Sequence, residues 1–244
     1  MQRPSRRRLW LLLTLAAACG LALGQQGWQW RDCRRQVEVA GSFDRVFFQT
    51  ESVEPAWLRE MCFEGSFQRV VEIRFHQGNV VDDDDMPRLQ GLPDLRHLYL
   101  SDLAITDAGL AHLRGATQLR SLGLRGTRVT HVGLSHLHDM RLLHGLNLSD
   151  TQVADLALAR LECLDQLRWL NLRHTQVTDE GLTHLKWLPK LAWLNLEHTQ
   201  VTDAGVDTLK RMPQLQRLYL HGSAVTDAGI HDLRQSMPYL YVVD

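Results

Sequence analysis

Leucines recur at a fixed interval of 24 residues over positions 92–236. Each copy reads L-x-x-L-x-L, followed by x-x-T-x-V-T-D-x-G-L-x-x-L with a few substitutions from copy to copy. Leucines two residues apart point to one face of a strand, and the residues between them point to the other face. Each copy therefore predicts a strand with one buried and one exposed face, beginning near the following leucines: Leu95, Leu119, Leu143, Leu167, Leu191 and Leu215.

The second part of each copy predicts a turn and a short helix. In one copy Val177 precedes Thr178 and Asp179, and the apolar pair Leu182 and Leu185 follows. Threonine is a good helix N-cap, an acidic residue suits the first helical turn, and residues three apart share a helix face. Units of strand, turn and helix that repeat every 20 to 29 residues stack into a solenoid with one parallel sheet and a continuous core. The sequence thus predicts an α/β solenoid.

The third copy departs most from this pattern. Ala154 stands where the other copies have the capping threonine, and Ala157 stands where they have glycine. We therefore expect the helical side of this copy to be the least regular.

The repeat pattern resembles that of the leucine-rich-repeat family over residues 92–236. The best copies are L-R-W-L-N-L-R-H-T-Q-V-T-D-E-G-L-T-H-L from Leu167 and L-A-W-L-N-L-E-H-T-Q-V-T-D-A-G-V-D-T-L from Leu191. The resemblance implies a right-handed, horseshoe-shaped leucine-rich-repeat solenoid, with a parallel sheet on the concave side, short helices on the convex side and an N-terminal cap. It also implies a protein-binding role without catalysis.

The N-terminus predicts export. A basic segment, residues 1–8, precedes mostly apolar residues 9–24, as in a secretory signal. We interpret residues 1–26 as a cleaved signal peptide or an uncleaved signal anchor, and Ala16-Ala17-Ala18-Cys19 also loosely resembles a lipoprotein cleavage site. Either way the repeats are predicted to be exported, secreted or held at the membrane only through this segment.

Residues 27–66 break the period and predict an N-terminal cap, since the end of a solenoid exposes core and strand edge. Apolar residues between Val37 and Phe48 suggest short strands, and Glu54–Met61 suggests a helix. Its Pro-x-Trp-Leu-Arg segment is similar to that of exported bacterial leucine-rich-repeat proteins of uncharacterised role. Cys33 and Cys62 either form a disulfide or remain two separate thiols. Cys163 carries no predicted chemistry.

The repeat domain is predicted to span residues 67–244. It divides into a diverged first repeat at 67–91, which contains Val70, Ile73 and Phe75, then six repeats at 92–236, and a half repeat at 237–244 that closes the C-terminal end.

The exposed strand positions form rows across the predicted sheet, because equivalent residues of neighbouring repeats lie about 5 Å apart. Tryptophan, tyrosine and arginine are enriched in binding hot spots. We therefore expect a partner-binding patch that includes Trp169, Trp193, Asn171, Asn195, Arg173, Glu197, Arg217, Tyr219 and Tyr99. Alternatively, the rings only stack on one another, and Asn171 and Asn195 form a structural amide ladder.

Two groups could suggest a metal. His174 and His198 share a row beside His221, but a zinc site needs three or four ligands. The run Asp82–Asp85 falls where the other copies begin their helix, so its carboxylates suit a helix N-terminus. We predict no metal, no cofactor and no enzyme, because no nucleophile elbow, phosphate-binding glycine loop or H-E-x-x-H occurs.

The formal net charge of -1 provides no basic field for nucleic acid. The resulting hypothesis is a monomeric, exported, non-catalytic module that binds a protein partner on its concave face. The alternative is a substrate receptor of a ubiquitin ligase, since the V-T-D-x-G-L repeat is also similar to that of F-box leucine-rich-repeat proteins. The export signal and the lack of an F-box-like helical segment argue against this alternative.

Overall fold

The computed structural model describes residues 35–36, 38–39, 46–52, 68–75 and 81–244. The predicted signal segment 1–26, the helix expected at Glu54–Met61, and Cys33 and Cys62 lie outside these residues. Within the described ranges, no helix has the length and apolar character needed to cross a membrane.

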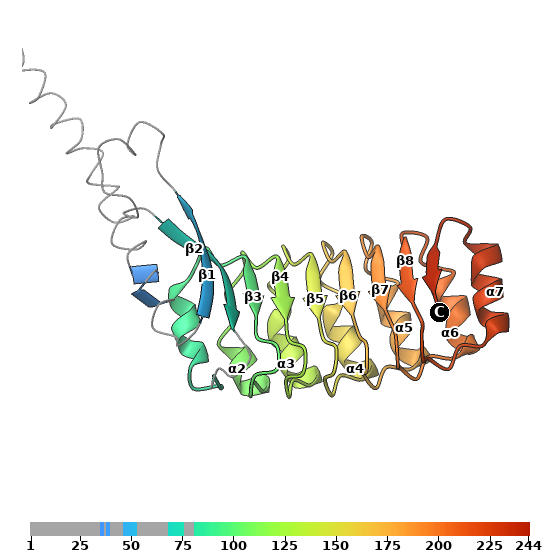
Figure 1. Cartoon of the computed structure of the whole chain (residues 1–244), viewed down its shortest axis with the longest axis horizontal. Helices are drawn as coiled ribbons and strands as arrows, with labels where there is room; N and C mark the ends of the chain where they lie inside the picture. Colours follow the sequence, from blue (N-terminus) through green and yellow to red (C-terminus); the bar gives the residue numbers. More distant parts are fainter. Residues whose placement is uncertain (1–34, 37, 40–45, 53–67, 76–80) are drawn as a thin grey trace, which may run out of the picture.

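A single nine-stranded sheet runs the length of the molecule in sequence order (Figure 1). The first strand pairs antiparallel with the second, and all later pairs are parallel. The strands are β1 (Val46–Ser52), β2 (Gln68–Phe75), β3 (His97–Tyr99), β4 (Ser121–Gly123), β5 (Gly145–Asn147), β6 (Trp169–Asn171), β7 (Trp193–Asn195), β8 (Arg217–Tyr219) and β9 (Tyr241–Val243).

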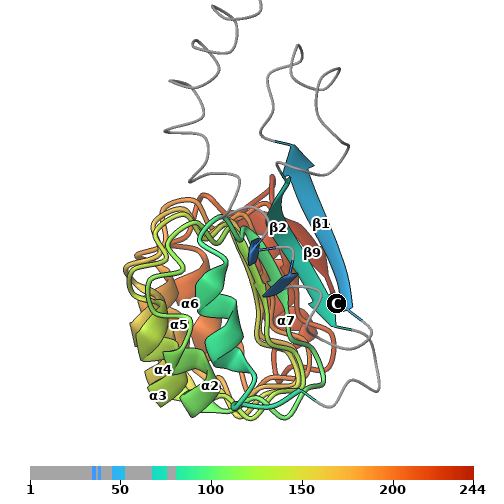
Figure 2. The same ribbon diagram turned by 90° about the vertical axis from the view of Figure 1, so that its left-hand side faces the viewer.

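Short helices cover one side of this sheet and leave the other side open (Figure 2). They are η1 (Met86–Gly91), α2 (Asp107–Ala111), α3 (His131–Leu134), η2 (Ser135–Leu137), α4 (Asp155–Leu158), η3 (Ala159–Leu161), α5 (Asp179–Leu185), α6 (Asp203–Leu209) and α7 (Asp227–Ser236). The predicted α/β solenoid is therefore confirmed.

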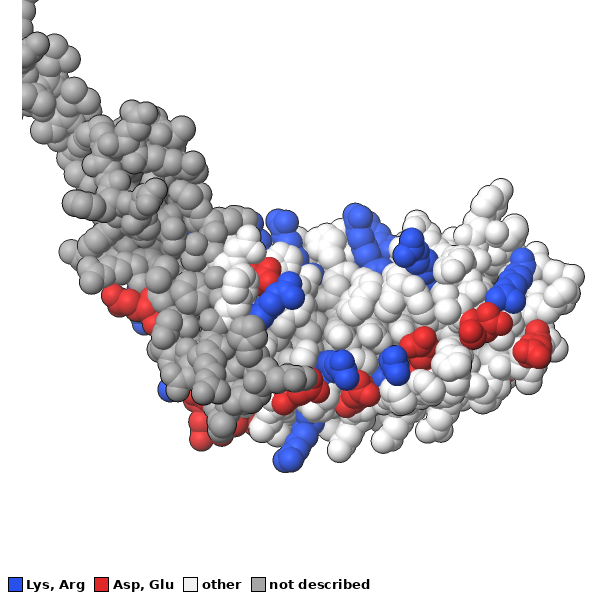
Figure 3. Space-filling view, viewed as in Figure 1, with Lys and Arg blue, Asp and Glu red and all other residues white. Residues whose placement is uncertain are grey.

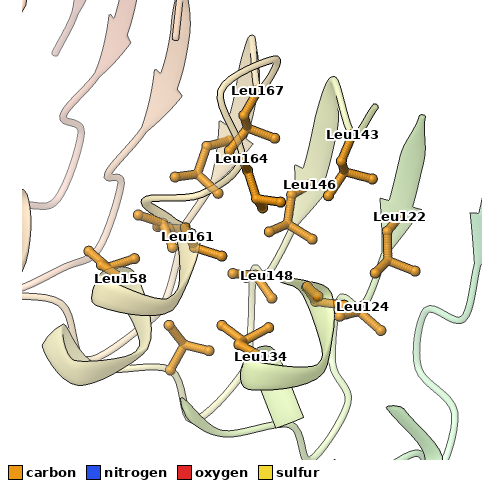
Figure 4. Close-up of a cluster of buried hydrophobic side chains, with 14 of the residues drawn as sticks. Leu122, Leu124, Leu134, Leu143, Leu146, Leu148, Leu158, Leu161, Leu164 and Leu167 are labelled. Carbon is orange, nitrogen blue, oxygen red and sulfur yellow. The ribbon is translucent and has the colours of Figure 1, made fainter. Parts of the chain in front are cut away.

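Leucines fill the space between the sheet and the helices (Figure 4). In one repeat, the following residues each have 0% exposure: Leu167, Leu170, Leu172, Val177, Leu182, Leu185 and Leu188. Replacing such a residue with alanine costs about 2–5 kcal/mol, so stacking of repeats is the main source of stability. Cys163 packs at the margin of this core, and burial raises the pKa of its thiol.

In most repeats, a hydrogen-bonded link joins a residue near the start of one helix to the start of the next helix. Asp179 accepts a 2.8 Å bond from the backbone N of Thr202 and a 2.6 Å bond from its hydroxyl. The Thr202 hydroxyl also caps its own helix by accepting a bond from Ala204 N. We call this link the Asp–Thr clamp, and it forms in five pairs: Asp83 with Thr106, Asp107 with Thr130, Asp155 with Thr178, Asp179 with Thr202, and Asp203 with Thr226.

The clamp explains both the glycine of the motif and part of the acidic run. A Cβ atom at Gly181 would lie 2.3 Å from Oδ1 of Asp155, so the glycine makes room for the carboxylate. In the run Asp82–Asp85, Asp83 forms the first clamp, and Asp82 accepts a bond from the backbone N of Asp84. The helix-terminus interpretation of this run was therefore incomplete, because Asp83 binds the neighbouring repeat.

Within residues 81–244, the clamp between α3 and α4 is missing. His131 stands where the aspartate would be, Ala154 cannot supply a hydroxyl, and Ala157 replaces the glycine that would otherwise make room. All three departures therefore belong to one gap between neighbouring repeats. The irregularity extends beyond the third copy, because α3 and α4 are both four-residue helices that continue as 3-10 turns.

The described N-terminal residues only partly follow the prediction. Residues 35–36 and 38–39 are helical, so the expected strand at Val39 is wrong, whereas β1 begins at Val46. Gln36 is fully buried, donates to Asp94 and accepts a bond from Val70 N. It thereby ties this helical segment to β2.

Candidate functional site

A row of aromatic rings crosses the C-terminal half of the concave face. The rings of Trp169 and Trp193 are stacked, with centroids 4.8 Å apart and planes at 21°. Tyr219 lies next, 5.0 Å from Trp193 and tilted by 46°. The expectation that both tryptophans are exposed is wrong, because each is half-buried. The structure therefore brings these residues together, and they stabilise one another.

The asparagines beside this row bind their own strands. Oδ1 of Asn171 accepts from Arg173 N at 3.0 Å, and Oδ1 of Asn195 accepts from Glu197 N at 2.7 Å. Asn195 is also buried, with 6% exposure, and its amide donates to the Glu197 carboxylate. Each asparagine thus holds its own strand end, and the described contacts contain no amide ladder between Asn171 and Asn195.

The charged residues expected in the patch differ in their surroundings. Arg173 and Glu197 form an ion pair with an N–O distance of 3.5 Å. Arg217 begins β8 beside Trp193 and is exposed. A partner would therefore meet a neutralised pair at one border of the face and an unobstructed guanidinium at the end of the aromatic row.

The three histidines form a second stack. The rings of His174 and His198 lie 4.3 Å apart and nearly parallel, and His221 meets His198 edge-on at 5.6 Å. Desolvation lowers the pKa of His198, and repulsion from His174 and Arg173 adds to the effect. Across the described residues, no cluster of three or more His, Cys, Asp or Glu side chains is arranged to hold a metal ion.

Backbone conformation accounts for the position of two of these histidines. His174 and His198 have φ of 53°, and Gly126 and Gly222 have φ of 67° at the equivalent position of their repeats. This left-handed region favours glycine, with asparagine, aspartate and histidine enriched among other residues. The turn after each strand thus restricts which residues can stand there.

Tyr99 lies apart from the aromatic row, across an open hollow in the sheet face. The hollow has a volume of about 430 Å³ and lies over β4 and β5. Its floor includes Gly123 and Gly145, and its two ends are Tyr99 on β3 and Trp169 on β6. We call this feature the central hollow.

Both ends of the central hollow are held in place. The guanidinium of Arg74 lies 4.2 Å from the centre of the Tyr99 ring and forms an ion pair with Glu72. The Glu72 carboxylate also raises the pKa of Arg74 through this hydrogen bond. At the other end, Trp169 is backed by Trp193. The hollow therefore has preformed aromatic walls.

A basic border runs along the amino ends of the strands. Arg120 precedes β4 and Arg168 precedes β6, where it lines the hollow together with His144. Among the described residues, neither Arg120 nor Arg168 has an ion-pair partner. Desolvation lowers the pKa of the nearby His97, and repulsion from Arg120 contributes to the shift.

The opposite border is electrically mixed. Arg125 pairs with Asp150 at 3.0 Å, and Arg173 pairs with Glu197. Figure 3 shows this difference, since blue atoms predominate along the upper border of the repeats and red and blue alternate along the lower border. The hollow thus has excess positive charge on one side only.

The family model for the leucine-rich repeat matches residues 117–177. The chain thus contains leucine-rich repeats. The crystal structure of an internalin C2 from Listeria monocytogenes is similar to it, with a TM-score of 0.53, 21% identity, and coverage of 75% of this chain and 86% of that one. An internalin from the same species matches at TM-score 0.43 and 17% identity, covering 71% of this chain and 60% of that one. A search of curated proteins found no match.

At 21% identity, the likeness of this chain to internalin C2 is one of fold. The large side chains of the exposed rows do not reveal the central hollow, because its floor is formed by glycines. The signal that could have revealed it is the absence of side chains at Gly123 and Gly145 on adjacent strands between two aromatic residues.

Proposed function

We propose that this leucine-rich-repeat protein is a non-catalytic interaction module that binds a protein partner on its concave sheet face. The observation that carries the proposal is the central hollow with aromatic side chains at both ends, Tyr99 and Trp169. Aromatic side chains in concave surfaces provide large contact area, and they dominate binding energy in protein interfaces. The exposed guanidinium of Arg217 and the rings of Trp193 and Tyr219 extend the surface.

The place of action that we propose is outside the cytoplasm. Residues 1–26 have the basic and apolar segments of an export signal, and they direct the repeats across a membrane or hold them on its outer side. We further propose that the chain acts as a monomer, and the pairing of β1 with β2, which covers that edge of the parallel strands, supports this.

Site-directed photo-crosslinking in source cells tests the binding face. The full chain would carry p-benzoylphenylalanine in place of Arg217 on the concave side, and a matched chain would carry it in place of Trp187, which is 61% exposed after α5. We expect a covalent adduct with one protein from the first position and none from the second. Adducts from Trp187 alone, or from neither position, would contradict binding on the concave face.

A further inference from the structure

We propose that the central hollow receives an aromatic side chain from an extended acidic segment of the partner, whose carboxylates pair with Arg120 and Arg168. This inference rests on the proposed function and specifies the chemistry of the partner at that site. Two observations support it: the central hollow has an aromatic side chain at each end, and the two arginines on its basic border have no ion-pair partner among the described residues.

The shape of the hollow favours a ring. Trp169 stacks on Trp193 through one face, and a Cβ atom built at Gly145 would lie 3.8 Å from Cε3 of Trp169. The space over Gly145 therefore borders the Trp169 ring. At the far end, a Cβ atom at Gly123 would lie 3.0 Å from Cδ1 of Tyr99. A ring placed on this floor would continue the row of Trp169, Trp193 and Tyr219 by one member.

The size of the hollow agrees with this occupant. β3 and β6 are three strand spacings apart, or about 14 Å, and each spacing is about 4.8 Å. Two opposing aromatic side chains at the ends leave room for a ring between them, and a volume of about 430 Å³ is in the range of sites that bind ligands. The glycine floor lets that ring approach the sheet, where β-branched or larger residues would fill the same space.

The charge of the border favours carboxylates. Arg168 lines the hollow and Arg120 stands two repeats before it, so their backbones are about 10 Å apart. An extended chain advances about 3.3 Å per residue, so three residues span this distance. A segment with an acidic residue on each side of the aromatic residue, separated by about three positions, matches both guanidinium groups and the hollow between them. The mixed opposite border offers no comparable excess charge.

Peptide display tests this chemistry directly. The full chain would be used to select binders from a random dodecapeptide library, and Gly145→Val would be kept out of the selection and used afterwards to test the enriched peptides. Valine suits a strand, and the Cβ contacts at this position are 3.7 and 3.8 Å, so the variant fills the hollow without a backbone clash. We expect the enriched peptides to share an aromatic residue flanked by aspartate or glutamate.

One enriched peptide, labelled with fluorescein, then gives affinities by fluorescence polarisation. Replacing its aromatic residue by alanine, or using Gly145→Val, should weaken binding about 30-fold, as for a hot spot. Arg120→Gln and Arg168→Gln should each weaken binding about two- to fivefold at low salt and reduce its salt dependence. Arg211→Gln, an exposed arginine two residues after α6 at the repeat position of Trp187, is the matched control and should leave affinity nearly unchanged.

Several outcomes would overturn the inference. The selection would contradict it if no peptide were enriched, or if the enriched peptides lacked the aromatic and acidic pattern. The affinity measurements would contradict it if Gly145→Val, or both Arg120→Gln and Arg168→Gln, bound the peptide as tightly as the natural protein. If Gly145→Val fails to fold, the two exposed arginine variants still decide the matter. An adduct from Arg217 in the crosslinking experiment would leave the proposed function standing in each case, so the two failures can be told apart.

Discussion

The gap in the row of Asp–Thr clamps should be repairable. Three substitutions, His131→Asp, Ala154→Thr and Ala157→Gly, would give α3 and α4 the residues that form the clamp elsewhere, as between Asp179 and Thr202. The triple variant should be more stable than the natural protein, and the three changes should be strongly coupled.

The magnitude follows from the contacts of an existing clamp. Threonine in place of alanine at the N-cap contributes about 1 kcal/mol. Each of the two hydrogen bonds to the carboxylate contributes about 1.5 kcal/mol, and glycine in place of alanine within a helix costs about 1 kcal/mol. The net gain is therefore about 3 kcal/mol in the free energy of unfolding. For a protein of this size, that corresponds to a rise in Tm of about 6–12 °C.

The single substitutions should not add up to this gain. A carboxylate introduced at position 131 would clash with the Cβ atom of Ala157. Gly181 stands at the equivalent position of its repeat, and a Cβ atom there would lie only 2.3 Å from Oδ1 of Asp155. His131→Asp alone should thus be neutral or destabilising, and Ala157→Gly alone should cost about 1 kcal/mol.

Urea denaturation of all single, double and triple variants, followed by circular dichroism, measures this coupling. Native-state hydrogen exchange adds a local readout, because the backbone amide of residue 154 should become protected only in variants that combine His131→Asp with Ala157→Gly. If the triple variant were no more stable than the sum of the singles, our account of the clamp, the cap and the glycine would be wrong.

Other substitutions test separate parts of the structure by urea denaturation. Asp179→Ala should cost about 2–4 kcal/mol through its two lost bonds, whereas Asp227→Ala, at the same helix position without a clamp among the described residues, should cost under about 1 kcal/mol. Gly126→Ala should cost about 1–2 kcal/mol, because φ is 67° there. Trp193→Ala should cost about 1–3 kcal/mol, because the half-buried ring loses two stacking partners. The pKa of His198 is lowered in the folded state, so the folded state binds fewer protons than the unfolded state, and the free energy of unfolding should fall as pH drops below about 6.5. His198→Asn should reduce this fall, and a variant with the same pH dependence as the natural protein would contradict the role of His198.

The sequence predicted the fold because the repeat imposes the same constraints in every copy. Stacking of identical units buries the leucines of every copy in the same way, and the observed cores of successive repeats follow this arrangement. The threonine cap was also predictable, as Thr178 and Thr202 show. The partner of the aspartate was not predictable. The clamp joins residues 23 positions apart in the sequence, and their distance in space depends on how the repeats stack.

The candidate site was only partly predictable for a related reason. Row membership follows from the period, so the proximity of Trp169 and Trp193 could be derived from the sequence. Their half-buried state could not, since it depends on ring orientation. Asn171 and Asn195 looked available for a partner, but side-chain to backbone bonds two residues along the chain already engage them. These side-chain to backbone bonds compete with hydrogen bonds to a partner, and the repeat pattern of the sequence does not show whether they form.

Internal contacts already engage several side chains of the sheet face, and this limits the surface that a partner can use. The asparagines hold strand ends, Arg173 is paired with Glu197, and Trp193 lies within a stack. Among the described residues of this face, the groups that retain unused binding capacity include one face of Trp169 and the arginines Arg120 and Arg168 around the central hollow, together with the exposed Arg217. Binding energy comes from interactions that are not already satisfied within the protein, so the large side chains of the row support the site while the glycines create it.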